Sequence, residues 1–135
     1  LYDWAGQIRT INISKKGTVF VSAAEIQACA DACFTRLAAF TGEGRSHQEI
    51  IEEIADFYST INMLHPFREG NGRTQRLFFT QWIRHLGYEF DLSNADLDEF
   101  MIATIYAAQG VMDPLIKFFD ETIQEPIVGA DMALQ

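Results

Sequence analysis

Apolar residues recur at helical spacing over most of this chain, whereas alternating runs occur only near its beginning. Apolar positions three and four residues apart predict five helices, over about residues 22–41, 46–64, 72–86, 94–108 and 114–123. Ile8 to Ser14 and Thr18 to Val21 are β-prone, and Lys15-Lys16-Gly17 supplies a turn between them, so they predict a β-hairpin. An isolated hairpin is marginally stable in water, so it has to lie against the helices. The pattern predicts an all-α bundle with one hairpin.

Local signals support several helix ends. Two helices are preceded by the Ser-x-x-Glu spacing of a capping box, at residues 22–25 and 46–49. Ser93 or Asn94 is the expected cap of the fourth helix, and Asp113 before Pro114 opens the last one. The expected inward residues of the third and fourth helices are Leu77, Phe78, Trp82 and Ile83, and Leu97, Phe100, Met101, Thr104 and Ile105.

The composition is that of one globular domain with an acidic surface. The chain has 135 residues, 48% of them hydrophobic, and a net charge of −9. No apolar run approaches the roughly 20 residues of a membrane span. The negative charge argues against nucleic acid as a direct partner. Four of the ten basic residues nevertheless cluster within a short stretch, at Arg68, Arg73, Arg76 and Arg84, which favours a bound small anion there.

The termini and the cysteines bear on organisation and location. The chain does not begin with Met, and its opening Leu-Tyr-Asp-Trp-Ala-Gly lacks the basic-then-apolar order of a signal peptide. We therefore expect N-terminal elements to be missing, residues 1–123 to form the domain and residues 124–135 to be a tail. Cys29 and Cys33 are four apart in a helical pattern, where a disulfide constrains little. Reduced thiols and a cytoplasmic location are expected.

Residues 65–76 read His-Pro-Phe-Arg-Glu-Gly-Asn-Gly-Arg-Thr-Gln-Arg and combine a base, a carboxylate, a glycine-rich turn and two arginines. The Gly-Asn-Gly turn at 70–72 allows successive N–H groups to converge on an anion. Pro66 ends the preceding helix, so a helix starting near Gly72 would add its N-terminal N–H groups and its dipole. Arg73 and Arg76 share one face of that first turn, where a phosphate chain would offset their unfavourable position.

Each part of this segment has an ordinary structural explanation when taken alone. The turn could simply join two helices, the histidine could be a core or capping residue, and the charged side chains could form a solvated face. One turn does not need all of them at these spacings, however. Their coincidence favours a site for a polyphosphate.

The same twelve residues fit the Fic-family signature H-x-F-x-D/E-G-N-G-R-x-x-R at every fixed position, and the chain resembles that family. The resemblance extends from the opening Tyr-Asp-Trp-Ala-Gly…Ile-Arg-Thr through the hairpin and the helix order to the Asp-Pro-Leu helix, over residues 1 to about 123. It implies the Fic fold, a helical bundle with a β-hairpin flap. It also implies protein adenylylation, in which AMP moves from ATP to a Ser, Thr or Tyr hydroxyl of a target protein and pyrophosphate leaves.

The resemblance implies a role for each matching residue. His65 would be the general base that takes the proton of the target hydroxyl, for which an ordinary imidazole pKa near 6.5 is suited. Phe67 would anchor the loop in the core, and Glu69 would hold Mg²⁺. The anion hole and the clamp on the β- and γ-phosphates would be formed by Gly70, Asn71 and Gly72, and by Arg73 and Arg76.

The hairpin corresponds to the flap of the family, to whose free edge a target segment would add by main-chain hydrogen bonds. We expect Thr18, Val19 and Phe20 to hold that segment. The target itself is not encoded in a motif, and bacterial type II topoisomerase subunits are one candidate. An effector of this family would act in a host cytosol instead of the bacterial one.

Fic enzymes are commonly inhibited by a helix of pattern Ser/Thr-x-x-x-Glu-Gly/Asn, whose glutamate pairs with the second arginine of the signature, here Arg76. Residues 1–135 contain no such pattern. We therefore expect the inhibitory helix on a separate small antitoxin, with this chain as the toxin. A missing N-terminal segment that carries the helix, or a protein without this inhibition, are the alternatives.

Three other functions are compatible with parts of the sequence. Relatives of the adenylylating enzymes transfer UMP, phosphocholine or phosphate, although the phosphate-transferring branch departs from the Gly-Asn-Gly-Arg stretch that this chain keeps. A catalytically idle Fic fold could serve as a binding module, against which the intact His65 and Glu69 argue. A metal hydrolase built on the same two residues lacks further ligands.

Overall fold

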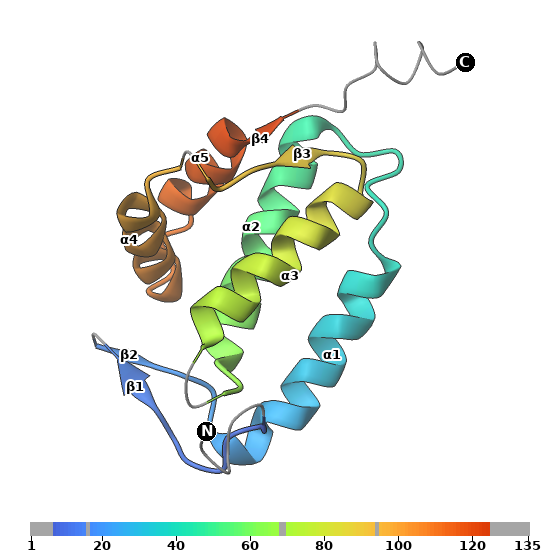
Figure 1. Ribbon diagram of the computed structural model, residues 1–135. Coiled ribbons are helices and arrows are strands. Elements are labelled where there is room, and N and C mark those ends of the chain that lie inside the picture. The colour runs from blue at the N-terminus through green and yellow to red at the C-terminus, as the bar shows by residue number, and fades with distance from the viewer. Residues whose placement is uncertain (1–6, 16, 68–69, 94, 125–135) are drawn as a thin grey trace.

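The computed structural model describes residues 7–15, 17–67, 70–93 and 95–124. The helices are η1 (Ala23–Glu25), α1 (Ile26–Ala39), α2 (His47–Leu64), α3 (Asn71–His85), α4 (Leu97–Ala108) and α5 (Asp113–Thr122). The strands are β1 (Ser14–Lys15), β2 (Thr18–Val19), β3 (Glu89–Phe90) and β4 (Ile123–Gln124). α2 packs against α1, α3, α4 and α5 and occupies the centre of the bundle (Figure 1). The predicted all-α bundle with one hairpin is confirmed.

The central helix begins where the sequence predicts. The Ser46 hydroxyl accepts a hydrogen bond from the N–H of Glu49 at 3.2 Å, and the Glu49 carboxylate accepts one from the N–H of Ser46 at 3.1 Å. This capping box satisfies two N–H groups that the helix itself leaves unpaired. The helix then buries one side chain per turn or more, namely Ile50, Ile51, Ile54, Ala55, Phe57, Tyr58, Ile61 and Leu64.

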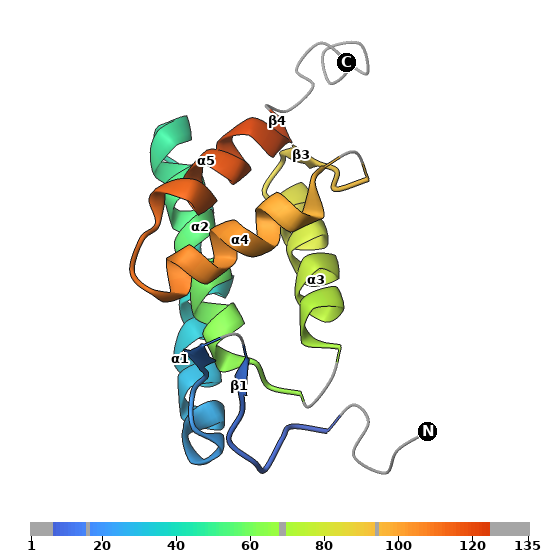
Figure 2. The same cartoon turned by 90° about the vertical axis from the view of Figure 1, so that its left-hand side faces the viewer.

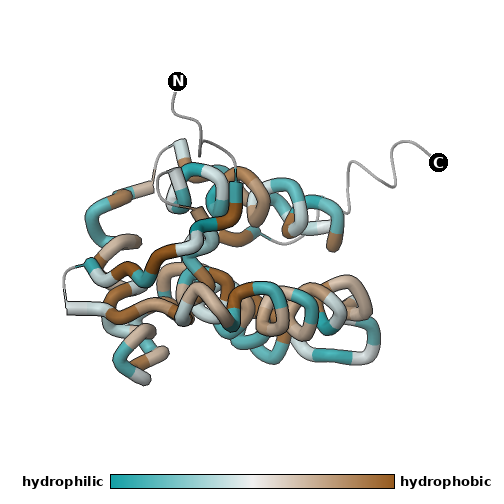
Figure 3. The backbone as a smooth tube through the Cα atoms, turned by 90° about the horizontal axis from the view of Figure 1, so that it is seen from below, coloured by the Kyte–Doolittle hydropathy of each residue, from teal (hydrophilic) through white to brown (hydrophobic). Residues whose placement is uncertain are grey.

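An aromatic cluster fills the space between α2 and the helices around it. Phe100 of α4 and Phe118 of α5 stack with ring centroids 4.3 Å apart. Tyr58 of α2 lies 4.9 Å from the rings of both Phe79 and Phe100. Figure 3 shows hydrophobic (brown) and hydrophilic (teal) residues interspersed along the helices. Aromatic pairs prefer particular ring geometries, so they restrict the relative positions of the helices more than the burial of apolar surface alone would.

The hairpin lies against the end of α2, as the sequence requires (Figure 2). Its strands pair Ser14 with Val19 and Lys15 with Thr18, and are shorter than predicted. A hydrogen bond of 2.8 Å from the N–H of Val21 to the carbonyl of Met63 joins the chain after β2 to the last turn of α2. The position of the hairpin is therefore set by the helix that ends beside it.

Some predicted helix ends are wrong. Ser22 precedes the 3₁₀ turn η1 and makes no capping hydrogen bond through its side chain, so the predicted capping box is absent there. α4 is capped by Asp96, whose carboxylate accepts hydrogen bonds from the N–H groups of Asp98 and Glu99 at 3.0 and 3.2 Å. Ser93 is therefore not the cap, and Asn94 lies outside the described residues.

Two of the predicted inward faces are rotated. Leu77 is 62% exposed, and Phe79 is the buried residue of α3 in its place. Leu97 and Met101 of α4 are 46% and 47% exposed, because this face of α4 borders a cavity instead of the core. Cys29 and Cys33 are both unpaired, as predicted.

The chain after α3 forms a small second sheet that the sequence analysis misses. Glu89 pairs with Gln124 and Phe90 with Ile123, so β3 and β4 tie the link after α3 to the end of α5. Phe90 and Ile123 are both buried. Residue 124 thus belongs to a strand, and the rest of the predicted tail lies outside the described residues. Within the described residues, none of the helices has the length and apolar character needed to cross a membrane.

Candidate active site

The predicted base, His65, ends the central helix in a strained backbone conformation. It is the C-cap of α2, with φ 42° and ψ 59°. Among the residues that the structure describes, it is the one non-glycine residue with a positive φ. The left-handed conformation costs a residue with a Cβ about 1–2 kcal/mol, so the surrounding contacts have to hold it. Pro66 follows, and the chain leaves the helix axis at this point.

The imidazole of His65 is half-buried beneath the hairpin. It stacks on the ring of Phe20, with centroids 3.9 Å apart and an angle of 16° between the planes. Its Nδ1 atom is buried without a hydrogen-bond partner among the described residues. Burial, followed by the charges of Arg9 and Lys15, lowers the pKa of His65 from 6.5 to about 4. The expected ordinary pKa near 6.5 is therefore wrong, because the burial of this ring has no sign in the sequence. The ring is neutral at pH 7, the state in which it can accept a proton.

Arg9 is a buried cation that holds this end of α2 in place. Its side chain donates to the carbonyl of His65 at 2.6 Å, to that of Leu64 at 3.0 Å, and to that of Ile11 at 2.7 Å. It also donates to the carbonyl of Val21, and its own N–H donates to the carbonyl of Pro66 at 2.7 Å. This role of Arg9 is not visible in the sequence, because one cation in a β-prone run gives no sign of its partners.

Asn71 closes the loop between α2 and α3. Its side-chain amide donates to the carbonyl of Phe67 at 2.6 Å, and its side-chain oxygen accepts from the N–H of Phe67 at 2.8 Å. The residue is 8% exposed, so both bonds are shielded from water. Gly70, with φ 80°, is the N-cap of α3, which begins one residue earlier than predicted. In this structure the amide group of Asn71 thus faces the loop, and its predicted contact with phosphate stays a prediction.

The beginning of α3 places the second arginine of the signature, Arg76, beside Gly72. A Cβ atom added to Gly72 would lie 3.1 Å from a terminal nitrogen of Arg76, so the glycine leaves space for that guanidinium. Next to Arg76, the Gln75 side chain donates to the carbonyl of Tyr58 at 2.7 Å and fastens α3 to α2. Arg73 is exposed.

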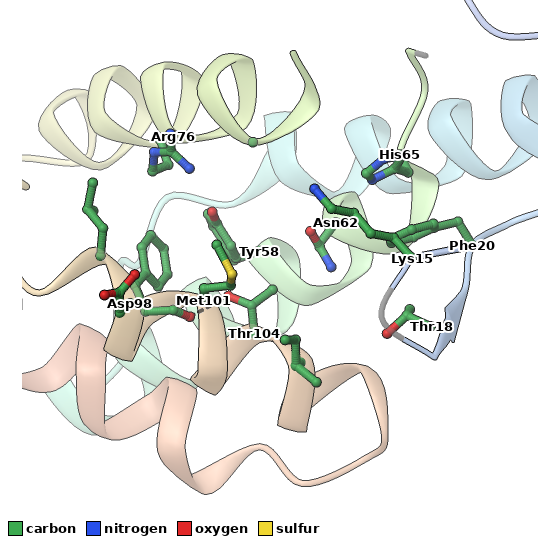
Figure 4. Close-up of a pocket in the computed structure, with 14 residues that line it drawn as sticks. Lys15, Thr18, Phe20, Tyr58, Asn62, His65, Arg76, Asp98, Met101 and Thr104 are labelled. Atoms are coloured by element: carbon green, nitrogen blue, oxygen red, sulfur yellow. Dashed lines mark hydrogen bonds between the residues drawn. The ribbon is translucent and has the colours of Figure 1, made fainter. Parts of the chain in front are cut away.

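A cavity of about 280 Å³ lies beside His65 and Arg76, between the helices and the hairpin (Figure 4). Its walls come from α2 (Tyr58, Asn62 and His65), α3 (Gly72 and Arg76), the hairpin (Lys15, Thr18 and Phe20) and α4 (Leu97, Asp98, Phe100, Met101, Thr104 and Ile105). The structure thus brings together five of the predicted site residues, namely Thr18, Phe20, His65, Gly72 and Arg76. The other described ones, Val19, Phe67, Gly70, Asn71 and Arg73, do not line it.

Phe67 lines a second cavity, of about 270 Å³, on the α1 side of the loop. Phe34 and Phe78 line the same cavity. The ring of Phe67 is half-buried among apolar side chains and is separate from the cavity that holds Arg76. This position agrees with an anchoring role, which stays a prediction.

The electrostatics of the first cavity suit an anionic ligand. Lys15 and Arg76 supply positive charge, and the N-terminus of α3 adds the positive end of its dipole. Burial raises the pKa of Tyr58, with Arg76 opposing the shift, so its hydroxyl keeps its proton and can donate. Asp98 is the carboxylate among the described lining residues. The arrangement can hold a phosphate chain beside a neutral base.

A metal site cannot be built from the described residues alone. They contain no group of three or more His, Cys, Asp or Glu side chains placed to hold an ion. Glu69, the predicted Mg²⁺ ligand, lies outside the described residues. Mg²⁺ usually takes one or two carboxylates and completes its shell with water and substrate phosphates, so one carboxylate beside a phosphate site fits this ion.

Two lining residues that the sequence analysis does not name could have been found from helical spacing. Tyr58 and Asn62 precede His65 by seven and three positions on the same helix. Residues at these intervals share one helix face, so a base at the end of α2 implies that these side chains lie beside it. Asp98 belongs to another helix and has no such local signal.

Comparisons with known proteins support the assignment of this fold. Residues 1–83 match the model of the Fic/DOC family. The chain is 34% identical over 127 residues to the "Probable protein adenylyltransferase Fic" of Salmonella typhimurium. This match covers 93% of the chain and 63% of the Salmonella protein. The chain is 38% identical over 117 residues to the "Probable protein adenylyltransferase y4lH" of Sinorhizobium fredii, covering 85% and 61%. The chain therefore spans about three fifths of the length of these relatives.

Solved structures give the same result for the fold. The N-terminal Fic domain of a VirB-translocated Bep effector protein from Bartonella quintana, which has bound ADP, superimposes with a TM-score of 0.86 at 26% identity. The match covers 99% of this chain and 69% of that one. With a family model that matches more than half of the sequence and a fold that agrees over nearly all of it, this chain belongs to the Fic/DOC family.

Proposed function

We propose that this protein is an adenylyltransferase that moves AMP from ATP to a hydroxyl group of a target protein. The observation that carries the proposal is the shared cavity that is lined by a neutral His65, by Arg76 and by Gly72 of the first turn of α3. The names of the Salmonella and Sinorhizobium relatives and the ADP in the Bartonella quintana domain support it. A base, a cation and free N–H groups are the parts that nucleotidyl transfer needs.

Each part of the site would have one role in the transfer of AMP. The target hydroxyl loses its proton to His65 as its oxygen forms a bond to the α-phosphorus, and the bond from that phosphorus to the pyrophosphate oxygen breaks. Arg76 and the N–H groups of the α3 turn hold the phosphates in line with the attacking oxygen. Bound Mg²⁺, held by Glu69, would neutralise charge on the leaving pyrophosphate.

The unusual pKa of His65 fits this sequence of events. In the free protein the nearby charges of Arg9 and Lys15 add to burial and keep the ring unprotonated. A bound triphosphate brings negative charge into the same cavity, which favours the protonated form of the ring. The basicity of His65 therefore rises when the nucleotide arrives, at the moment at which it has to take a proton.

The target would be held by the hairpin. β2 is an edge strand with two residues, and Val19 is 73% exposed while Thr18 lines the cavity. An extended segment that pairs with this edge would place a side chain at the mouth of the cavity, since alternate residues of a strand point to opposite faces. Main-chain pairing selects an extended segment and leaves the choice of the exact sequence to side-chain contacts.

We also propose that a separate small antitoxin restrains the enzyme by placing a glutamate on Arg76. A carboxylate in that position would occupy the guanidinium that the γ-phosphate requires, and Arg76 is accessible from the cavity. Under this proposal the protein is a toxin that acts in the bacterial cytoplasm. A type II topoisomerase subunit is a candidate target.

Incubation with a bacterial lysate and ATP labelled at either the α- or the γ-phosphate tests the transfer. Protein label from the α position alone, in the presence of Mg²⁺, is the expected result, with a loss of about 10²–10⁴-fold in His65→Ala. Label from the γ position alone would show phosphate transfer and overturn adenylylation. Equal labelling by wild type and His65→Ala would remove His65 from the reaction, and labelled UTP or CDP-choline in parallel reactions identifies a different donor.

A further inference from the structure

We propose that Arg9 is a positioning residue for the transfer reaction, which fixes His65 and the hairpin in one relative geometry. This inference rests on the proposed function, because it concerns the placement of the base and of the target-binding strand. Arg9 does not itself line the cavity, and its hydrogen bonds to described residues reach the backbone of His65 and not the first turn of α3. Its effect on the reaction would be exerted through the backbone of the residues that it binds.

The partners of Arg9 form two groups. One group consists of the carbonyls of residues 64, 65 and 66, at the point where α2 ends and the chain turns into the loop. The other group consists of the carbonyls of Ile11 and Val21, which precede and follow the hairpin. The side chain and the main-chain N–H of Arg9 therefore connect both sides of the hairpin to His65 and its neighbours.

The end of α2 needs such partners for a physical reason. The last carbonyls of a helix have no N–H group of the same helix to bind, and an unpaired buried carbonyl is destabilising. The reversal at His65 leaves the carbonyls of Leu64 and His65 without helical partners, and the Arg9 guanidinium supplies them. The fork geometry of arginine, with five donor N–H groups, allows several carbonyls to be bound at once, which a lysine ammonium does less well.

Arg9 also places a positive charge beside His65. It is 3% exposed, and none of the described carboxylates lies within salt-bridge distance of it. Within the described part of the chain, the other charged or titratable groups around His65 and its cavity are Lys15, Tyr58, Arg76 and Asp98. The positive charge of Arg9 lowers the pKa of the neighbouring imidazole and is thus one of the groups that keep it neutral.

The experiment compares Arg9→Lys, which keeps the charge and loses the fork, with Arg9→Gln, which loses the charge. Arg84→Lys is the matched control, because Arg84 is an exposed arginine at the far end of α3. Each variant is measured for unfolding temperature, for ADP affinity by calorimetry, and for kcat and KM of AMP transfer. Rates are expressed per folded molecule, counted by ADP titration, so that loss of folded protein does not register as a loss of catalysis.

We expect ADP affinity and the KM for ATP to stay within about 3-fold of wild type and kcat to fall by about 10- to 100-fold in both Arg9 variants, since a displacement of about 1 Å can cost that much. Arg84→Lys should match the wild type. A kcat per folded molecule equal to that of wild type in either Arg9 variant overturns the proposal. So does a rise in KM that accounts for the whole loss in kcat/KM.

A second readout does not depend on activity. The chain has three histidines, and the ring signals of His65 in an NMR spectrum are assigned by their absence in His65→Ala. The pKa of His65 should rise in Arg9→Gln and stay low in Arg9→Lys, while the ring chemical shift, which reports the stack with Phe20, should move in both. Unchanged signals in both variants contradict the positioning role. If wild type transfers no AMP, the proposed function fails, and these signals still decide whether Arg9 positions His65.

Discussion

The ring of Phe20 lies flat on the imidazole of His65, with centroids 3.9 Å apart and planes 16° from parallel. Phe20 directly follows β2, and His65 ends α2, so the contact joins the hairpin to the predicted base. Phe20 is 8% exposed, and its ring is occupied by this contact. Among the three residues predicted to hold a target, Val19 and Thr18 have the freer side chains.

Removal of the Phe20 ring should make His65 more basic. In Phe20→Ala, water reaches the imidazole, and because burial is the largest cause of the lowered pKa, that pKa should rise from about 4 towards 6.5. NMR titration of the ring protons measures it. Val19→Ala, which changes an exposed residue of the same hairpin, is the control and should leave the pKa unchanged. A pKa that stays near 4 in Phe20→Ala would show that the stack does not shield the ring.

The stability of the protein should depend on pH through His65. Its pKa is lowered in the folded state, so between about pH 4 and 6.5 the unfolded chain binds a proton that the folded chain does not. The free energy of unfolding should therefore fall as pH drops through this window, by about 1–2 kcal/mol once solvent screening of a half-buried ring is included. Urea unfolding at several pH values gives the slope, and His65→Ala should be flatter over the same window.

Arg76 and Arg84 lie on the same helix and should differ in their effect on nucleotide binding. Arg76 lines the cavity, whereas Arg84 is exposed near the C-terminal end of α3. Arg76→Ala removes a charge-assisted contact worth about 1.5–3 kcal/mol, so the affinity for a nonhydrolysable ATP analogue, which keeps the γ-phosphate, should fall by roughly 10- to 100-fold. Arg84→Ala should bind the same analogue like wild type. Calorimetric titration decides, and equal affinities in the two variants would place the phosphates elsewhere.

Asn71 should matter for the stability of the loop. In Asn71→Asp the side chain keeps its size but loses the N–H that donates to the carbonyl of Phe67. It also places a negative charge in a site that is 8% exposed. We expect a loss of about 1–3 kcal/mol in the free energy of unfolding, measured in urea. Gln81→Glu, an equivalent change at an exposed position of α3, should cost far less.

The parts of the fold that depend on local patterns could be predicted from the sequence. α2 has both a capping box and a continuous apolar face, and its bounds agree with the prediction within a residue at each end. The Gly-Asn-Gly turn followed by a helix likewise shows in the sequence before the structure. These features are determined by residues close to one another along the chain.

The missed features depend on distant partners. β3 and β4 have two residues each, too few for an alternating pattern, and their pairing joins residues 89–90 to 123–124. Asp96 cannot be singled out as the cap from the sequence, because Ser93 and Asn94 have equally suitable side chains nearby. Arg9 binds carbonyls more than 50 positions away, and a carbonyl has no signature in the sequence. His65 and Arg76 of the candidate site can therefore be predicted from the sequence, whereas the contacts that hold His65 in place cannot.

The proposed base, His65, caps a helix whose turns form the core, whereas the strand proposed to bind a target belongs to a hairpin with two-residue strands. Substitutions in the exposed part of the hairpin therefore need no compensation among the buried aromatic residues. Under the proposed function, relatives of this protein can acquire new targets by changes in a few surface positions. The position of His65 depends on the core and on the buried contacts of Arg9, and not on these surface positions, so the reaction should be conserved while its protein substrates diverge.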